Sequence, residues 1–178
     1  MTALVIGGAG SGKSAFAEKL LCRLSGNARR AYLAAMEPFG PEAEARIRRH
    51  RAARAGKDFV TVECYVNLTP AMLPSGSAAL LEDVGNVCAN ALFSPRWEGL
   101  RTAQGIVEAI GGLAERCQTL VLVTNETFCD GMRYGEDTLR WLSALSYVNR
   151  KLAAGADAVY EVSSGMVERW KGTDACGC

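Results

Sequence analysis

One short segment constrains this chain more than any other, because residues 7–14 read Gly-Gly-Ala-Gly-Ser-Gly-Lys-Ser. The spacing Gly-x-x-x-x-Gly-Lys-Ser is that of the Walker A motif. An apolar run, Leu4-Val5-Ile6, precedes it and a helical pattern starts at Lys13, which is the strand–loop–helix setting that the motif needs. Glycines let the backbone aim successive N–H groups at phosphate oxygens, and the helix N-terminus adds partial positive charge. The segment therefore predicts a phosphate-binding loop.

Within this loop, we expect Lys13 to reach the β- and γ-phosphates of a nucleotide and the Ser14 hydroxyl to bind magnesium. A glycine-rich turn that merely joins strand to helix is the alternative, and it leaves the fixed lysine and serine unexplained. The motif does not say whether the phosphate is transferred, hydrolysed or sensed. The candidate nucleotide-binding residues here are Gly7, Gly8, Ala9, Gly10, Ser11, Gly12, Lys13 and Ser14.

The rest of the chain alternates between apolar runs and amphipathic patterns. The runs cover residues 4–6, 31–35, 78–81, 120–124 and 158–162, and the helical patterns cover 13–24, 41–55, 100–117 and 138–154. This order predicts an α/β fold of the P-loop NTPase type (RecA-like), with a mainly parallel sheet and flanking helices. Ser163-Ser164-Gly165 between two strand-like pieces predicts a β-hairpin at the C-terminal edge of the sheet.

Composition limits the remaining possibilities. With 178 residues, 49% of them apolar, we expect one domain over 1–172 and a short tail over 173–178. A net charge of +1 gives no field that would attract nucleic acid or a membrane surface. No run is long enough to span a membrane and no signal peptide is recognisable, so a cytoplasmic location is expected. The seven cysteines lack zinc-site spacing and are expected to be small buried hydrophobes.

Acidic and amide side chains follow two of the predicted strands. Glu82 and Asp83 come directly after the run at 78–81, and Asn125 follows the run at 120–124. Ligands bind at the carboxyl ends of parallel strands, so Glu82 or Asp83 is a candidate anchor for a magnesium nucleotide. The alternative is that one of them caps the helix that follows.

The basic segment from Glu42 to Arg54 carries the only histidine. Helical spacing places Arg46, His50 and Arg54 on one face. Arginines there could hold a triphosphate, and a neutral imidazole nitrogen is a nucleophile toward phosphorus. On spacing alone, however, a charged helix of this kind is most often a solvated surface, and chemistry alone does not decide between the two interpretations.

The order of several motifs goes beyond a fold class. The P-loop is followed by Arg46-Ile47-x-x-His50-Arg51, then by Leu80-Leu81-Glu82, by Val123-Thr124-Asn125-Glu126 and by Asn149-x-x-Leu152-Ala153. This series, nearly end to end, resembles the bifunctional adenosylcobinamide kinase/adenosylcobinamide-phosphate guanylyltransferase family. The Arg-Ile-x-x-His-Arg segment is the more specific part, because many families share the P-loop.

The resemblance implies two reactions of cobalamin biosynthesis. ATP or GTP first phosphorylates the aminopropanol arm of adenosylcobinamide, and GMP is then transferred from GTP to the new phosphate. His50 looks like the histidine that becomes guanylylated, with loss of pyrophosphate, and Lys13 like the lysine of the kinase step. The resemblance also implies a corrinoid partner and a homo-oligomer, commonly a trimer.

Further nucleotide contacts are carried over by position. They are Ala34, Ala35, Met36, Arg51, Ala52, Ala53, Arg54, Glu63 and Glu82, with Ser14 and Glu82 on the magnesium. The chain departs from the family pattern at 127–133, Thr-Phe-Cys-Asp-Gly-Met-Arg, where corrinoid contacts are expected. A kinase without guanylyl transfer and a non-catalytic nucleotide switch are the competing hypotheses. Trp97, Trp141, Trp170, Tyr32 and Tyr65 are interpreted as packing residues.

Overall fold

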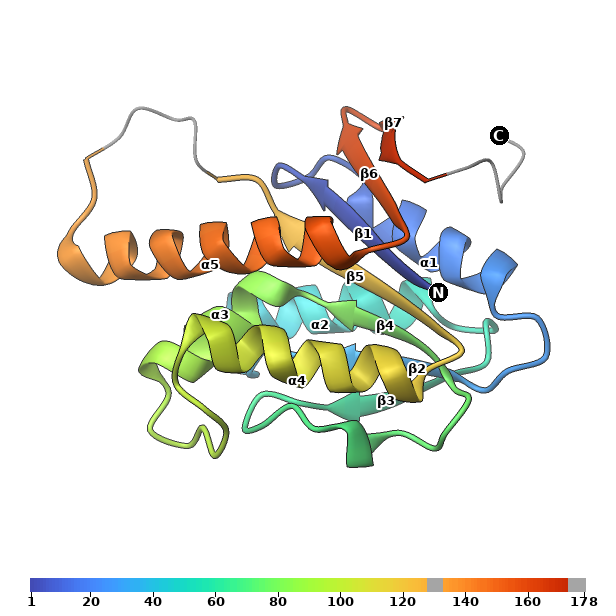
Figure 1. Cartoon of the computed structure of the whole chain (residues 1–178), viewed down its shortest axis with the longest axis horizontal. Coiled ribbons are helices and arrows are strands. Elements are labelled where there is room, and N and C mark those ends of the chain that lie inside the picture. Colours follow the sequence, from blue (N-terminus) through green and yellow to red (C-terminus); the bar gives the residue numbers. More distant parts are fainter. Residues whose placement is uncertain (128–132, 173–178) are drawn as a thin grey trace.

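The computed structural model describes residues 1–127 and 133–172, and these form a seven-stranded sheet in the order β3-β2-β4-β5-β1-β6-β7 (Figure 1). Neighbouring strands are parallel except for β7, which runs antiparallel to β6. The strands are β1 Thr2–Gly7, β2 Arg30–Ala34, β3 Phe59–Glu63, β4 Ala78–Glu82, β5 Thr119–Asn125, β6 Ala158–Ser163 and β7 Met166–Lys171.

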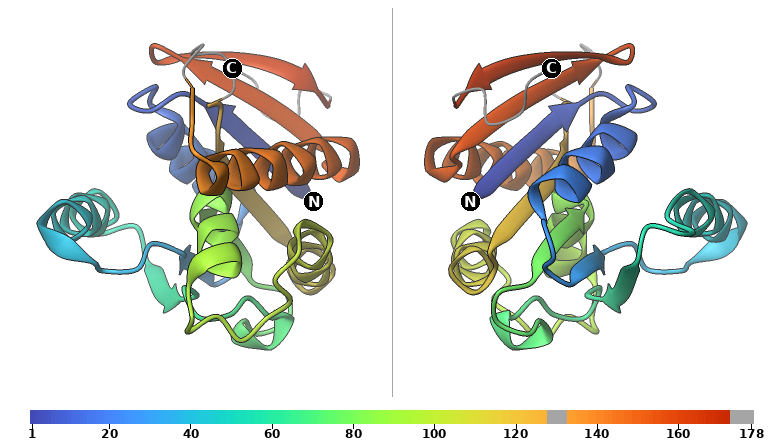
Figure 2. Two further views of the ribbon diagram at one scale, coloured as in Figure 1. Left: turned by 90° about the vertical axis from the view of Figure 1, so that its left-hand side faces the viewer. Right: turned by 90° about the vertical axis from the view of Figure 1, so that its right-hand side faces the viewer.

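Helices cover both faces of the sheet. On one face α1 (Lys13–Leu24) packs against β1, β4, β5 and β6. On the other, α3 (Val84–Phe93), α4 (Ala103–Arg116) and α5 (Glu136–Gly155) pack together over β5, and the short 3-10 helix η1 (Pro70–Met72) contacts α4. The basic helix α2 (Gly40–Ala53) stands away from the body on the α1 side (Figure 2).

Strand alternation explains why the sheet has two buried faces. Successive side chains of a strand point to opposite faces, so an apolar run in a central strand fills both sides. Leu4 and Leu81 belong to the core under α3, α4 and α5, whereas their neighbours Val5 and Leu80 belong to the core under α1. These central runs are therefore buried on both faces, as the continuous apolar segments predict.

The predicted C-terminal hairpin is confirmed. Strands β6 and β7 are joined by Ser164 and Gly165, whose φ angles are 51° and 80°. Positive φ at both central residues matches the right-handed twist of the two strands, which is why a glycine at the second position is favoured. The Gly165 N–H donates to the carbonyl of Ser11 at 2.9 Å, so this turn braces the phosphate-binding loop.

The α/β prediction with its P-loop is confirmed. The helix expected at 13–24 has those bounds, and the ends of the other three expected helices shift by one to three residues. Strand β3 was missed, because its residues are mostly exposed at the sheet edge and carry no continuous apolar run. Cys64, Cys88 and Cys117 are buried free thiols, as expected, whereas Cys22 is only half-buried, and burial raises the pKa of Cys64 to about 12. Among the described residues, no helix is long and apolar enough to cross a membrane. The expected tail, 173–178, lies outside the described residues.

Candidate functional site

The phosphate-binding loop leads from β1 into α1 at the carboxyl end of the sheet. Gly10 and Gly12 have φ angles of 72° and 94°, a left-handed backbone that a side chain would strain. Gly12 is the N-cap of α1 and brings no side chain to its N–H groups. A helix start of this kind is a preformed anion site.

Lys13 is folded back over this loop. Its Nζ donates to the carbonyl of Gly8 at 3.0 Å, and the residue is 8% exposed. Burial lowers the pKa of Lys13, and the nearby carboxylates of Asp83 and Glu82 offset part of that shift. The ammonium therefore lies desolvated within the loop, where an anionic ligand would stabilise it.

Glu82 ends β4 and is the centre of the site's hydrogen bonds. It is 7% exposed and accepts a hydrogen bond from the Ser14 hydroxyl, while its other oxygen accepts from Tyr32 at 3.3 Å. His50 Nδ1 lies 3.4 Å from Oε1. Burial favours the neutral acid, but attraction and hydrogen bonding from His50, Ser14 and Tyr32 outweigh it, so the pKa of Glu82 is lowered. The carboxylate is a buried, ionised acceptor.

Glu82 and Asp83 divide the two roles that the sequence left open. Asp83 is the N-cap of α3 and accepts from the Asn86 N–H at 2.7 Å. Burial raises the pKa of Asp83, and its hydrogen bonds to Asn86 and Asn125 offset part of that rise. Both carboxylates line the cavity, and Glu82 is the one that accepts from Ser14.

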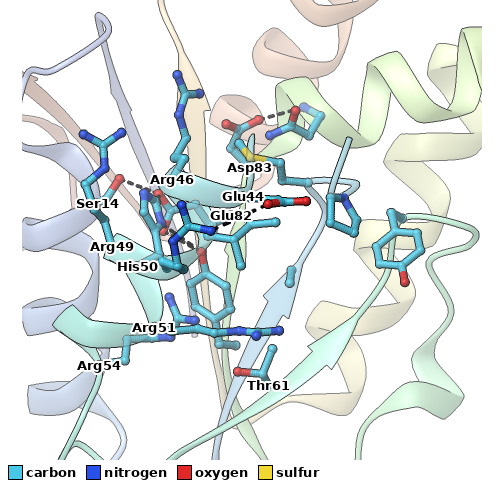
Figure 3. A pocket seen from close by; sticks show the side chains of 18 of the residues that line it. Ser14, Glu44, Arg46, Arg49, His50, Arg51, Arg54, Thr61, Glu82 and Asp83 are labelled. Atoms are coloured by element: carbon cyan, nitrogen blue, oxygen red, sulfur yellow. Dashed lines mark hydrogen bonds and ion pairs between the residues drawn. The ribbon is translucent and has the colours of Figure 1, made fainter. Parts of the chain in front are cut away.

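The helix α2 carries both surface ion pairs and cavity-lining residues. Arg46 pairs with Glu42 and Arg48 with Glu44, each at 3.6 Å between exposed side chains, and Arg46, Arg48 and Glu44 also line the cavity. Such i, i+4 pairs are typical of a solvated helix. His50 lies deeper, and Figure 3 shows it beside Ser14 and Glu82. The sequence had left open whether His50 lies near the P-loop, and the structure places it there.

Arg54, the C-cap of α2, is buried beneath the same helix. Its guanidinium stacks 3.2 Å from the centre of the Tyr32 ring, and the residue is 6% exposed. Nη1 has no hydrogen-bond partner among the described residues. A buried guanidinium without a carboxylate partner is costly on its own, which favours an anionic ligand nearby.

Tyr32 is a site residue that the sequence analysis assigned to packing. Its hydroxyl lies 3.1 Å from His50 Nδ1 and 3.3 Å from Glu82 Oε2. In the register of β2 and β4, Tyr32 pairs with Leu80 and Ala34 with Glu82. Residues two apart share a face, so Tyr32 and Glu82 meet above the sheet. That pairing is the signal that would have identified it.

The cavity has a volume of about 520 Å³ and opens between the P-loop, α2 and the strand ends. Pockets of this size accept a nucleotide or another drug-sized ligand. On its outer wall, Glu63 accepts from Tyr65 at 2.8 Å and lies 3.9 Å from Arg51. The expected site residues that line the cavity are Ala9, Gly10, Lys13, Ser14, Ala34, Met36, His50, Arg51, Arg54, Glu63 and Glu82.

Other expected residues lie beside the cavity but do not line it. These are Gly7, Gly8, Ser11, Gly12, Ala35 and Ala52. The carbonyl of Gly8 still accepts a hydrogen bond from Lys13 Nζ. Ala35 is fully buried in the core, so only its backbone could contact a ligand. The side chain of Ala53 lies outside the part of the chain that the structure describes. Residues 128–132 of the expected corrinoid-contact segment are outside it as well.

Comparison with known proteins gives consistent matches. The family model described as CobU, cobinamide kinase / cobinamide phosphate guanyltransferase, matches residues 3–169. The bifunctional adenosylcobalamin biosynthesis protein CobU of Salmonella typhimurium is 33% identical over 181 residues, covering 93% of this chain and 97% of that protein. Its namesake in Escherichia coli is 32% identical, with the same coverage. The ATPase domain of G40P has a TM-score of 0.50 at 12% identity, covering 90% of this chain and 68% of its own, and shares the fold alone.

Proposed function

This chain belongs to the cobinamide kinase / cobinamide phosphate guanyltransferase family and is a transferase of that kind, and we propose that it carries out both reactions in this one cavity. The first moves the γ-phosphoryl group of ATP or GTP to the hydroxyl of the aminopropanol arm of adenosylcobinamide. The second moves GMP from GTP to that new phosphate through a guanylylated His50. The observation that carries the proposal is the direct contact of His50 and Ser14 with the same carboxylate, Glu82.

In the kinase reaction, the P-loop backbone and Lys13 would hold the β- and γ-phosphates. Both positive charge and N–H groups there stabilise the charge that the transferring phosphoryl group develops. Ser14 and Glu82 supply oxygen ligands of the kind magnesium prefers, and they already touch one another. Among the described residues, no cluster of three His, Cys, Asp or Glu side chains could hold a metal ion by itself. Mg2+ would therefore be shared with the nucleotide's phosphate oxygens, neutralising their charge.

In the guanylyl transfer, a ring nitrogen of His50 attacks the α-phosphorus of GTP and pyrophosphate leaves with the electrons of the broken P–O bond. The phosphate of the corrinoid then attacks the same phosphorus, and the P–N bond breaks. Arg51, in the last turn of α2, and Arg54, its C-cap, both line the cavity and would hold phosphate oxygens beside His50. The unpartnered Nη1 of the buried Arg54 supports this role.

The first test uses GTP labelled at the α-phosphate. Purified protein is incubated with Mg2+ and labelled GTP and then denatured. We expect protein-bound label that survives alkali and is released by acid, present in the wild type and absent in His50→Ala. Arg150→Ala is the matched control, because it removes an exposed cation of α5 that does not line the cavity.

A second measurement separates the competing hypotheses. GTP or ATP labelled at the γ-phosphate is incubated with cobinamide, and label in the corrinoid is counted. Transfer of γ-label without protein-bound α-label indicates a kinase that lacks guanylyl transfer. Absence of both labels from a folded wild-type protein that still binds GTP indicates a nucleotide switch.

A homotrimer in the cytoplasm is proposed from the family resemblance. The apolar residues Met166 and Trp170 are 72% and 65% exposed on the edge strand β7, which supports a covering by another chain. Sedimentation equilibrium of the purified protein tests it, and a mass of one 19.0 kDa chain at micromolar concentration would contradict it.

A further inference from the structure

Tyr32 joins the two halves of the site. We propose that Tyr32 is the positioning residue of guanylyl transfer: its hydroxyl bridges His50 Nδ1 and Glu82, and so holds the imidazole with its proton on Nδ1 and its lone pair on Nε2. This inference rests on the guanylyl transfer proposed above. It names which nitrogen attacks and which side chain decides it.

Hydrogen-bond accounting gives the direction of each bond. The Tyr32 hydroxyl has one proton to donate and lies within reach of two groups, His50 Nδ1 at 3.1 Å and Glu82 Oε2 at 3.3 Å. The Tyr32 hydroxyl donates to Glu82 Oε2, so its one proton is used there. The Tyr32 oxygen can then accept from an Nδ1–H. The opposite arrangement would leave an unprotonated Nδ1 facing Glu82 Oε1 at 3.4 Å, lone pair against lone pair.

The neutral imidazole that results has its nucleophilic lone pair on Nε2. Nε2 has no hydrogen-bond partner among the described residues, and the His50 side chain is 26% exposed where it lines the cavity. When Nε2 attacks the α-phosphorus, the N–P bond forms and pyrophosphate leaves. The ring becomes a cation that keeps its Nδ1 proton, and Tyr32 and Glu82 stabilise that charge. Breakage of the N–P bond by the acceptor phosphate returns the lone pair to Nε2.

The two oxygens of Glu82 explain why a tyrosine is needed. Oε1 accepts from Ser14 and is also the oxygen nearest His50, so it lies on the side where the nucleotide's cation would bind. Oε2 accepts from Tyr32. A cation that draws on Oε1 competes with His50 for that oxygen, whereas the path from Oε2 through Tyr32 to Nδ1 is unaffected. Tyr32 therefore keeps His50 oriented while Glu82 serves the P-loop.

Tyr32 is rigidly held for this purpose. It is 5% exposed on β2, within the sheet, and its ring is covered by the Arg54 guanidinium at 3.2 Å. A side chain whose rotamer is fixed by packing orients its partner at little entropic cost. Tyr32→Phe keeps the ring and its stacking and removes only the hydroxyl.

The test uses the fact that His50 is the only histidine in the chain, so protein labelled with 15N-histidine gives one pair of ring-nitrogen signals. Spectra are recorded without nucleotide or metal at about pH 9, where ordinary imidazoles are neutral. In the wild type we expect a protonated Nδ1 and an unprotonated Nε2. In Tyr32→Phe only Glu82 Oε1, at 3.4 Å, still faces Nδ1, so we expect a smaller share of the Nδ1-protonated tautomer than in the wild type. An unprotonated Nδ1 in the wild type overturns the proposal.

Kinetics give the second measurement. Tyr32→Phe is expected to lower kcat of guanylyl transfer roughly 10- to 100-fold, as loss of a partner that orients a reacting histidine does, with little change in KM for GTP. The control is Tyr147→Phe, which removes a hydroxyl that donates to Gln104 on α4 and does not line the cavity. An unchanged kcat in Tyr32→Phe overturns the inference. If wild-type protein forms no enzyme–GMP at all, the proposed function fails, while the spectra still report the tautomer.

Discussion

Gly7, where β1 enters the phosphate-binding loop, offers a direct test of how tightly the loop is built into the sheet. A Cβ at this position would lie 2.3 Å from the carbonyl oxygen of Val162 in β6 and 2.8 Å from Ser11 Oγ. Since the nearest atom belongs to backbone, β6 or the loop must move by about 1 Å to restore van der Waals contact. Overpacking of this kind costs about 1–3 kcal/mol. For a chain of this length, Gly7→Ala should lower Tm by roughly 2–12 °C.

The matched control is the next residue. A Cβ at Gly8 would meet no atom within 4 Å, and the φ angle there is not positive, so Gly8→Ala should leave Tm within about 2 °C of the wild type. Thermal unfolding of the three proteins, without nucleotide, measures both changes. Equal Tm values for Gly7→Ala and Gly8→Ala would refute the close contact between the loop and β6.

Three further predictions concern charge, helix packing and acid stability. Lys13→Ala should raise the activation free energy of γ-phosphoryl transfer by several kcal/mol, which is measured as a fall in kcat/KM. In α4, a Cβ at Gly111 would meet no atom within 4 Å, so Gly111→Ala should stabilise the fold by about 0.5–1 kcal/mol. A Cβ at Gly112 would lie 2.7 Å from Pro70, so Gly112→Ala should be less stable than Gly111→Ala in urea unfolding. Folding lowers the pKa of Glu82, so ionised Glu82 stabilises the fold fully above its ordinary pKa of 4.5, and this contribution is lost as the pH falls further. Glu82→Gln should therefore lose less stability between pH 6 and pH 3 than the wild type.

Local signals explain what could be predicted from the sequence. The Walker A spacing, the apolar runs and the Ser164-Gly165 turn each depend on a few adjacent residues, and each appears in the structure where expected. Strand β3 depends instead on pairing with β2 alone at the sheet edge. Val60 within it is 64% exposed, so its sequence carries little of the apolar pattern that identifies a buried strand.

The site was predictable only in part, for a related reason. Glu82 follows an apolar run, and that position marks the carboxyl end of a strand without any knowledge of the neighbours. The role of Tyr32 depends on the register that sets Ala34 beside Glu82, a contact between β2 and β4 that no local pattern contains. The position of His50 depends on the path of the chain from 35 to 50, which ends with His50 Nδ1 3.4 Å from Glu82 Oε1. Those long-range facts are what the structure adds.

The proposed function requires one cavity to serve two transfers to different phosphorus atoms, and the geometry is compatible with it. Lys13 and the start of α1 are placed at the phosphate-binding loop, whereas His50 approaches from α2 on the far side of Glu82. A triphosphate held in the loop would present its γ-phosphoryl group for the first reaction. In the second, the same loop would hold the departing pyrophosphate while His50 meets the α-phosphorus. Under the proposed function Lys13 would stabilise the charge on the leaving group in both transfers, so a single phosphate-binding loop would suffice while the attacking group and the attacked phosphorus differ.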